Sequence, residues 1–281
     1  MSEYAFPEVL VSTDWVKQHM HTPGVRVVEI DVDTKQYETG HIPGSVPLHC
    51  KQQLQDQVHR DIVSRAEFER LMGSLGIRST DTIVLHGDNH NWFAAHGFWL
   101  LKYYGHQDVR IMNGGRVKWL NEDDKPLTSD RTRVTPASYA VSQEHPGLRA
   151  RVADVLAASS SGACRIVDVR SPDEYLGKAI SPPGLQEGAQ RGGHVPGAVN
   201  VPWARSVNPD GTFKSADQLR QIYVDGAGVD PTRPAICYCR VGERSSHTWF
   251  VLKYLLGVTD VRNYDGSWTE YGNLVGVPIE R

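Results

Sequence analysis

His41–Ser45 reads HIPGS and His194–Ala198 reads HVPGA, so one pentapeptide occurs twice in the chain at a displacement of 153 residues. Three further pairs of matching segments follow in the same order, at displacements of 151 or 152 residues. They are Gly76-Ile77 with Gly228-Val229, Lys102-Tyr103 with Lys253-Tyr254, and Asn113-Gly114-Gly115 with Asp265-Gly266-Ser267. Matches at one nearly constant displacement indicate a duplicated structural unit. The 281 residues therefore predict two similar domains.

Each half of the sequence alternates strand and helix patterns. Short apolar runs that are typical of buried strands occur at 25–30, 82–85, 165–167 and 235–238. Helical patterns follow at 94–104 and at 245–256, and Gly257 is a natural stop for the second of them. Apolar strands separated by helices indicate a mostly parallel sheet that is covered on both faces. We expect each half to form a three-layer α/β/α domain.

The join between the halves is predicted in the polar stretch from about residue 121 to residue 147. We assign a first domain to residues 1–130, a linker to 131–147 and a second domain to 148–281. A Pro- and Gly-rich stretch at 181–193 has no counterpart in the first half. It is interpreted either as a functional loop or as a solvated insertion.

Composition and charge exclude several functional classes. The hydrophobic fraction of 40%, the charged fraction of 22% and the net charge of -3 are typical of a soluble globular protein. They give no reason to expect nucleic acid or an acidic membrane as partner. No apolar run reaches the roughly 18 residues that span a bilayer. The N-terminal residues carry no secretory pattern, and we expect a cytoplasmic location.

The four cysteines are Cys50, Cys164, Cys237 and Cys239. They are too few for a disulfide framework, and their spacing does not match a redox or zinc motif. No cluster of His, Cys and Asp has metal-ligand spacing, and no Gly-rich nucleotide loop occurs. We therefore expect neither a metal nor a cofactor. The ordinary role of a single cysteine is that of a small buried apolar residue.

Cys239 is different because it opens a short loop, Cys239–Ser245, between a predicted strand and a predicted helix. Ligands of parallel α/β sheets bind beyond the carboxyl ends of the strands, where this loop lies. Gly242 permits a tight curve that turns backbone N–H groups inward, and the following helix directs its positive end at the loop. Arg240 and Arg244 add positive charge. A thiol in such a setting is expected to ionise readily and to act as a nucleophile without an adjacent base.

The first half provides an internal control for this interpretation. In the alignment set by the two Lys-Tyr pairs, Asp88 stands in the place of Cys239, and Asn89–Phe93 stand in the place of the following loop. That loop has neither a nucleophile nor an arginine, so only the second half is expected to be catalytic. Trp92 and Phe93 are expected either to pack between domains or to form an apolar wall of the pocket.

Histidines are not expected to take part in the chemistry. His41 and His194 recur in both halves, including the one without a nucleophile, so we interpret them as turn residues that bind backbone. His247 follows Cys239 by eight residues within a helix, where a packing or surface role is more common than a catalytic one.

These motifs together resemble the tandem-domain rhodaneses, which are thiosulfate sulfurtransferases, over essentially the whole chain. The two His-x-Pro-Gly motifs, the Cys-led loop in the second half alone and Asp265–Trp268 carry the resemblance, and residues 239–250 are most similar to actinobacterial members. The resemblance implies two tandem domains, each around a mainly parallel five-stranded sheet. It also implies that Cys239 carries a persulfide.

The resemblance further assigns roles around the nucleophile. Donor binding would fall to the loop residues Arg240, Val241, Gly242, Glu243, Arg244 and Ser245. Asp168 would brace the loop, supported by Arg170, and the side chains of Trp92 and Phe93 would line the pocket. Thiosulfate would give its outer sulfur to Cys239 and leave as sulfite, and cyanide, a thiol or a protein would then accept the sulfur.

Departures from vertebrate rhodaneses leave alternatives open. Val241 and Glu174 stand where those members carry a lysine and an arginine that bind the donor. Arg240 and Arg244, with Arg170 or Arg191, would have to compensate. One alternative is a 3-mercaptopyruvate sulfurtransferase, although its relatives carry Gly after the cysteine.

Two further alternatives are a cysteine-dependent phosphatase or arsenate reductase and a non-catalytic module that accepts sulfur. Cysteine phosphatases place an arginine six residues after the cysteine, where this chain has Ser245. The loop is therefore one residue short for phosphate chemistry.

Overall fold

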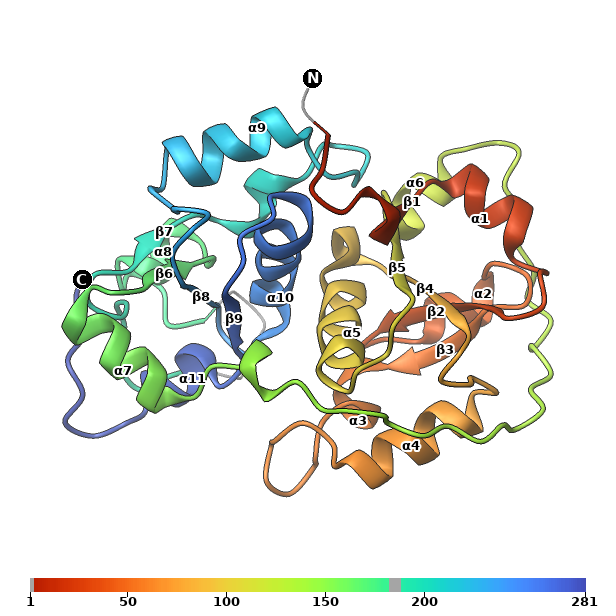
Figure 1. Cartoon of the computed structure of the whole chain (residues 1–281), viewed down its shortest axis with the longest axis horizontal. Coiled ribbons are helices and arrows are strands. Elements are labelled where there is room, and N and C mark those ends of the chain that lie inside the picture. The colour runs from red at the N-terminus through yellow and green to blue at the C-terminus, as the bar shows by residue number, and fades with distance from the viewer. Residues whose placement is uncertain (1–2, 182–187) are drawn as a thin grey trace. The chain divides into compact units, whose positions relative to one another are not determined.

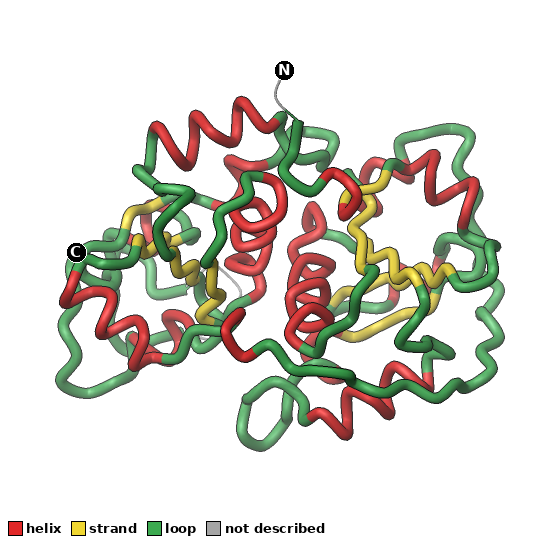
Figure 2. Tube along the Cα trace, viewed as in Figure 1, coloured by secondary structure: helices red, strands yellow, loops and turns green. Residues whose placement is uncertain are grey.

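The computed structural model describes residues 3–181 and 188–281. The chain forms two compact units, each built around its own sheet (Figures 1 and 2). The N-terminal unit contains Glu8–His145 together with Asn208–Phe213. The C-terminal unit contains the start of the chain through Pro7, Pro146–Val207 and Lys214–Arg281. No helix among the described residues is long and apolar enough to cross a membrane.

The N-terminal unit has the expected five-stranded parallel sheet, with strand order β1-β5-β4-β2-β3. Its strands are β1 (Leu10–Val11), β2 (Val25–Asp31), β3 (Val46–His49), β4 (Thr82–His86) and β5 (Val109–Met112). Its helices are α1 (Thr13–His19), α2 (Lys35–Thr39), α3 (Cys50–Gln53), α4 (Arg65–Ser74), α5 (Trp92–Tyr103) and α6 (Gly115–Leu120). A 3₁₀ turn, Asn89–Asn91, lies between β4 and α5, and another, Pro7–Val9, lies where the chain passes into this unit.

Helices cover both faces of this sheet because successive side chains of a strand point to opposite faces. On one face, Val27 packs with Val16 of α1 and Trp119 of α6. On the other face, Val28 lies with Phe68 of α4 and Leu101 of α5 around one small apolar cavity. The strands are buried on both faces, which explains why their sequences are continuously apolar rather than alternating.

The C-terminal unit repeats this architecture with one strand fewer among the described residues. Its strands are β6 (Arg165–Asp168), β7 (Val199–Asn200), β8 (Ala235–Tyr238) and β9 (Val261–Tyr264), all parallel in the order β7-β6-β8-β9. The expected fifth strand is reduced to a single parallel bridge between Arg149 and Asn263. The reason is local, because Pro146–Leu148 form a 3₁₀ turn and leave too little extended chain to continue the pairing.

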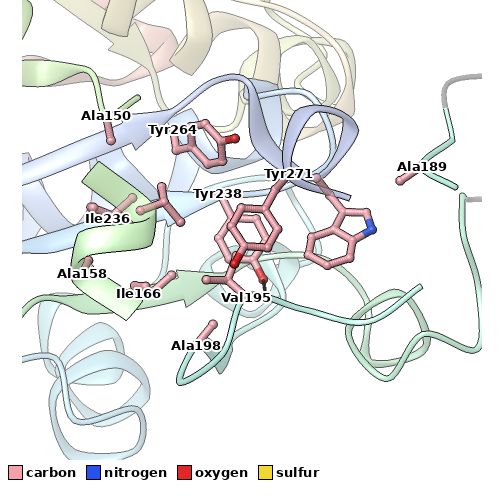
Figure 3. Packing of buried hydrophobic residues seen from close by; sticks show 12 residues of the cluster. Ala150, Ala158, Ile166, Ala189, Val195, Ala198, Ile236, Tyr238, Tyr264 and Tyr271 are labelled. Carbon is pink, nitrogen blue, oxygen red and sulfur yellow. Dashed lines mark hydrogen bonds between the residues drawn. The ribbon is translucent and has the colours of Figure 1, made fainter. Parts of the chain in front are cut away.

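The helices of this unit are α7 (Val152–Ser161), α8 (Pro172–Tyr175), α9 (Ala216–Arg220), α10 (Glu243–Phe250) and α11 (Ser267–Tyr271). The predicted helix at 245–256 is confirmed, although its second half, Val251–Leu255, is a π-helix. Gly257 follows with a positive φ of 75°, as a helix stop requires. Tyr238, Tyr264 and Tyr271 gather around Ile236 in the core of the unit (Figure 3).

The recurring histidines have the structural role that the repeat predicted. The Nδ1 atom of His41 lies 2.8 Å from the carbonyl oxygen of Tyr37, and that of His194 lies 2.9 Å from the carbonyl oxygen of Tyr175. Each imidazole also stacks on the ring of the same tyrosine, with centroids 3.7 and 3.6 Å apart. Both units therefore have the same turn, in which a histidine binds a tyrosine carbonyl and stacks on the tyrosine ring. His247 is fully buried and packs edge-on against Trp203, in agreement with its predicted packing role.

The segment that we interpreted as a linker hydrogen-bonds to the N-terminal unit. Ala137 N–H donates to the carbonyl of Gly73, and His145 N–H donates to the carbonyl of Tyr103. Of the irregular stretch at 181–193, residues 182–187 lie outside the described residues. Arg191 donates to four backbone carbonyls of residues 271–277, so it anchors the C-terminal segment.

Candidate active site around Cys239

Cys239 directly follows β8 at the carboxyl edge of the C-terminal sheet, and α10 begins four residues later. Gly242, the residue before α10, has a φ of 96°. A Cβ atom at this position would lie 2.7 Å from the Cα atom of Asp265, closer than real Cβ contacts occur. Only glycine suits both this backbone angle and this spacing, so it permits the tight turn that the sequence predicted.

One backbone amide of the loop contacts the sulfur of Cys239. Gly242 N–H donates to the Cys239 Sγ at 3.1 Å. The carbonyls of Cys239 and Arg240 accept from the backbone N–H groups of Trp268 and Thr269, each at 3.0 Å. Because the two ends of a trans peptide point in opposite directions, the N–H groups of Arg240 and Val241 are turned away from α11. The carbonyls of Cys239 and Arg240 are thus held by α11, while Gly242 N–H faces the sulfur.

Ser267 holds the other side of the nucleophile. Its Oγ accepts from Cys239 N–H at 3.1 Å and donates to the carbonyl of Tyr264 at 2.6 Å. Ser267 is fully buried. Its φ of 53° lies in the left-handed region of the backbone, which residues other than glycine seldom adopt. Its counterpart in the repeat is Gly115, with a φ of 57°. A serine at this position accepts backbone strain and supplies a hydroxyl beside Cys239.

The loop arginines are placed differently from each other. Arg244 makes a two-pronged ion pair with Glu174, with N···O distances of 2.9 and 3.0 Å. Burial by itself raises the pKa of Glu174, but the hydrogen bonds and charge of Arg244 hold that pKa below its usual value. The Arg244 charge is thus matched by a carboxylate from 70 residues earlier in the chain. Arg240 is buried, while Val241 and Glu243 are partly exposed.

Asp168 and Arg170 form a buried ion pair at the end of β6. Asp168 accepts from the Arg170 guanidinium at 2.6 to 3.1 Å and from the Tyr238 hydroxyl at 2.6 Å. The guanidinium lies 4.5 Å from the ring centroid of Trp268 in α11. Asp168 thereby contacts the residue that immediately precedes Cys239, and Arg170 contacts the helix that receives the loop carbonyls.

The other cysteines lack such surroundings. Cys237 is fully buried within β8, and burial raises the pKa of its thiol far above the usual value. Burial also raises the pKa of Cys164. Cys50 begins α3 in the N-terminal unit and is buried as well. The sulfur of Cys239, by contrast with those of Cys164 and Cys237, accepts from the backbone amide that precedes α10.

The corresponding loop of the N-terminal unit lies among buried carboxyl groups and one arginine. Asp88 takes the place of Cys239, and Arg116 Nε lies 3.8 Å from its carboxylate. The same arginine binds Glu29 at 3.0 and 3.2 Å. Burial raises the pKa of Glu29 to about 7 and that of Asp31 to about 8. The site holds carboxyl groups and no thiol, and its expected lack of a catalytic role stays a prediction.

Trp92 and Phe93 lie at the start of α5, beside this acidic loop. Their rings meet edge to face with centroids 5.4 Å apart, and Phe93 is buried. Their role as a pocket wall stays a prediction.

Sequence reasoning missed three polar residues that hold the loop, namely Ser246, Asn263 and Ser267. A signal for them was available in the repeat, because Ala95, Ile111 and Gly115 occupy the corresponding positions. Among residues 3–181 and 188–281, no group of three or more His, Cys, Asp or Glu side chains could hold a metal ion.

Comparison with known proteins decides the family. A family model described as "Rhodanese-like domain" matches residues 12–122 and again residues 151–274. The chain is a tandem rhodanese. Both matched segments carry the same fold, so this rhodanese is a duplicated α/β/α protein, as the repeat predicted.

Relatives of this rhodanese have names that refer to sulfur chemistry. It is 53% identical to "Sulfur carrier protein TtuD" of Thermus thermophilus, over 99% of this chain and 98% of the relative. It is 52% identical to "Putative thiosulfate sulfurtransferase" of Saccharopolyspora erythraea, over 97% and 96%. The crystal structure of SseA from Escherichia coli, a 3-mercaptopyruvate sulfotransferase, aligns with a TM-score of 0.81 at 26% identity, over 92% and 98%. The chain is a sulfurtransferase of the rhodanese type.

Proposed function

We propose that this rhodanese takes the outer sulfur of thiosulfate onto Cys239 and passes it to cyanide or a thiol. The observation that carries the proposal is the contact of Gly242 N–H, which lies 3.1 Å from the Cys239 sulfur at the N-terminal end of α10. Backbone amides and a helix N-terminus stabilise an anionic sulfur, both as a thiolate and as a persulfide.

The reaction balances in two steps. The Cys239 thiolate attacks the outer sulfur of thiosulfate, a new S–S bond forms, and the electron pair of the old S–S bond leaves with sulfite. Cyanide or a thiolate then attacks the outer sulfur of the persulfide and regenerates the Cys239 thiolate. No general base is needed if the thiol is already ionised, which agrees with the absence of histidine contacts to Cys239 among the described hydrogen bonds.

One observation favours a second donor class, a persulfide on a carrier protein. Arg244 directs both terminal nitrogens to Glu174, and this pairing weakens the attraction of the loop for a small dianion. A relative of 53% identity also bears the name of a sulfur carrier protein. The same Cys239 chemistry would serve a protein donor, with a thiolate rather than sulfite as the leaving group.

Intact mass spectrometry after incubation with thiosulfate tests the proposal. We expect the mass of one sulfur atom to be gained, with one equivalent of sulfite released, and lost again when cyanide is added. Cys239→Ser should abolish both signals, and Cys164→Ser should retain them. A sulfur adduct that persists in Cys239→Ser would refute the assignment, and a protein persulfide as the only effective donor would select the second class.

A further inference from the structure

A buried polar cluster lies under the loop of Cys239, formed by Ser245, Ser246 and Asn263. All three side chains are fully buried. Ser245 and Ser246 lie in the first turns of α10, and Asn263 lies in the adjacent strand β9. An unsatisfied polar group in such a place destabilises the fold, so the purpose of the cluster needs an explanation.

The cluster converges on one carbonyl group, that of Gly242. The Ser246 Oγ lies 2.8 Å, the Ser245 Oγ 3.0 Å and the Asn263 Nδ2 3.2 Å from the Gly242 carbonyl oxygen. Ser246 N–H also donates to it at 3.2 Å. The single proton of the Ser245 hydroxyl can alternatively serve the Asn263 Oδ1, which is 2.6 Å away. The Asn263 amide also donates to Ser246 at 2.9 Å, so its Nδ2 and Oδ1 are both satisfied.

Fixing this carbonyl fixes the amide on the other side of the same peptide. The Glu243 N–H belongs to the Gly242–Glu243 peptide and points opposite to the Gly242 carbonyl, out of the N-terminus of α10. The preceding amide, Gly242 N–H, contacts the Cys239 sulfur. The cluster therefore orients the peptide groups at the point where the helix meets the nucleophile.

The repeat shows that the fold itself does not need these polar residues. Val261 pairs with Ala235 in one sheet as Val109 pairs with Ile83 in the other, so Asn263 and Ile111 hold equivalent positions. On the matching helix, Ala94 and Ala95 of α5 stand where α10 has its two serines. The N-terminal unit is fully packed at all three apolar residues. Within this chain, the cluster accompanies the cysteine loop.

We propose that Ser245, Ser246 and Asn263 are positioning residues that orient the Gly242–Glu243 peptide, so that the amides at the start of α10 face the anionic sulfur of Cys239. This inference rests on the proposed role of Cys239. It assigns to the cluster the task of preorganising the loop before the donor arrives. None of the three residues needs to touch the donor.

The chain itself supplies the test variant, Ser245→Ala/Ser246→Ala/Asn263→Ile, which copies the apolar packing of the N-terminal unit. The readout is the ultraviolet absorbance of the thiolate against pH, corrected with the same protein carrying Cys239→Ser. In the triple variant, we expect the midpoint of the absorbance curve to move to higher pH by about one unit. This shift is a tenfold loss of thiolate at a given pH below the midpoint. The rate of sulfite release should fall in proportion. Chemical denaturation confirms that the variant is folded.

Thr248→Val is the matched control, because Thr248 is a fully buried hydroxyl residue of the same helix whose Oγ1 lies 3.5 Å from the Tyr223 hydroxyl. The control should leave the thiolate curve in place. An unmoved curve in the folded triple variant, or an equal movement in Thr248→Val, overturns the inference. If the triple variant does not fold, Ser246→Ala takes its place, with an expected shift of about half a unit. Because the readout needs no donor, a failure of sulfur transfer in the wild type would sink the proposed function without deciding this question.

Discussion

Glu174→Gln should strengthen the binding of thiosulfate, because it releases the positive charge of Arg244 at the loop. The glutamine keeps the shape of the glutamate, and it can still accept from Ser171 at the N-terminus of α8. What changes is the charge. The side chains of Glu174 and Arg244 are only 3% and 12% exposed, so their pairing is little screened by water.

The magnitude follows from Coulomb's law. Two unit charges 4 Å apart interact by about 4 kcal/mol at an effective dielectric constant of about 20, and by about half of that at twice the distance. Solvent and counterions at the mouth of the loop reduce the interaction between the Arg244 charge and thiosulfate further, to about 1 kcal/mol. This free energy corresponds to a roughly fivefold lower KM for thiosulfate. Thiosulfate carries two negative charges, so it should gain more than the singly charged 3-mercaptopyruvate.

Initial rates of sulfite release over a range of thiosulfate concentrations measure the effect. The gain should shrink as salt is added, since screening weakens the interaction. Asp173→Asn is the matched control, because it removes the same charge from an exposed position of the same helix. Our reasoning is refuted if Glu174→Gln leaves KM unchanged or raises it, or if Asp173→Asn lowers KM equally. Circular dichroism should verify that the variant, which loses a buried ion pair, is still folded.

Three further predictions concern the backbone turn at Gly242, the buried ion pair of Asp168 and the carboxyl group of Asp31 at the end of β2. Gly242→Ala should slow persulfide formation at least about tenfold, because its Cβ would clash with backbone 2.7 Å away, whereas Gly147→Ala, with open space around it, should not. Asp168→Asn should lower the free energy of unfolding by about 3–5 kcal/mol, because it leaves a buried guanidinium without its carboxylate. The control Asp154→Asn, in a partly exposed pair, should cost less than about 1 kcal/mol in urea denaturation, and equal costs would contradict the argument. Burial raises the pKa of Asp31 to about 8, so its contribution to stability is full below about pH 4 and is lost as the pH rises through 8. Asp31→Asn should therefore flatten the fall of the free energy of unfolding over this range, by up to about 5 kcal/mol for a shift of about four pKa units, and a pH profile identical to that of the wild type would argue against a raised pKa.

The alternation of short apolar strands with helices made both units predictable. Burial on both sheet faces leaves a strong signal in the sequence, because each strand must be apolar along its length. The β8 strand at 235–238 was placed to the residue, and Gly257 ends the helical stretch as expected. Of the five strands expected in the C-terminal unit, the described residues form four, and the edge strand is reduced to the bridge between Arg149 and Asn263 because Pro146–Leu148 form a turn beside it.

The candidate site at Cys239 could be proposed from the sequence because its signal is local. Cys239 and Gly242 lie within one loop, and the loop lies between one strand and one helix. The repeat added the decisive contrast, since Asp88 occupies the same place in the half that lacks a nucleophile.

The charge state and rigidity of the site depend on contacts that only the tertiary structure forms. Arg244 of the loop forms an ion pair with Glu174, and the Gly242 carbonyl accepts a hydrogen bond from Asn263 of β9. One partner comes from helix α8 and the other from strand β9, and no spacing along the chain indicates that these side chains meet those of the loop. The sequence by itself determined the duplicated fold and the choice of Cys239 as the candidate nucleophile, because periodicity and loop composition are local properties. Tertiary packing decided which charges are paired and which amide faces the Cys239 sulfur. Both features depend on distances of a few ångströms between residues that lie far apart in the chain.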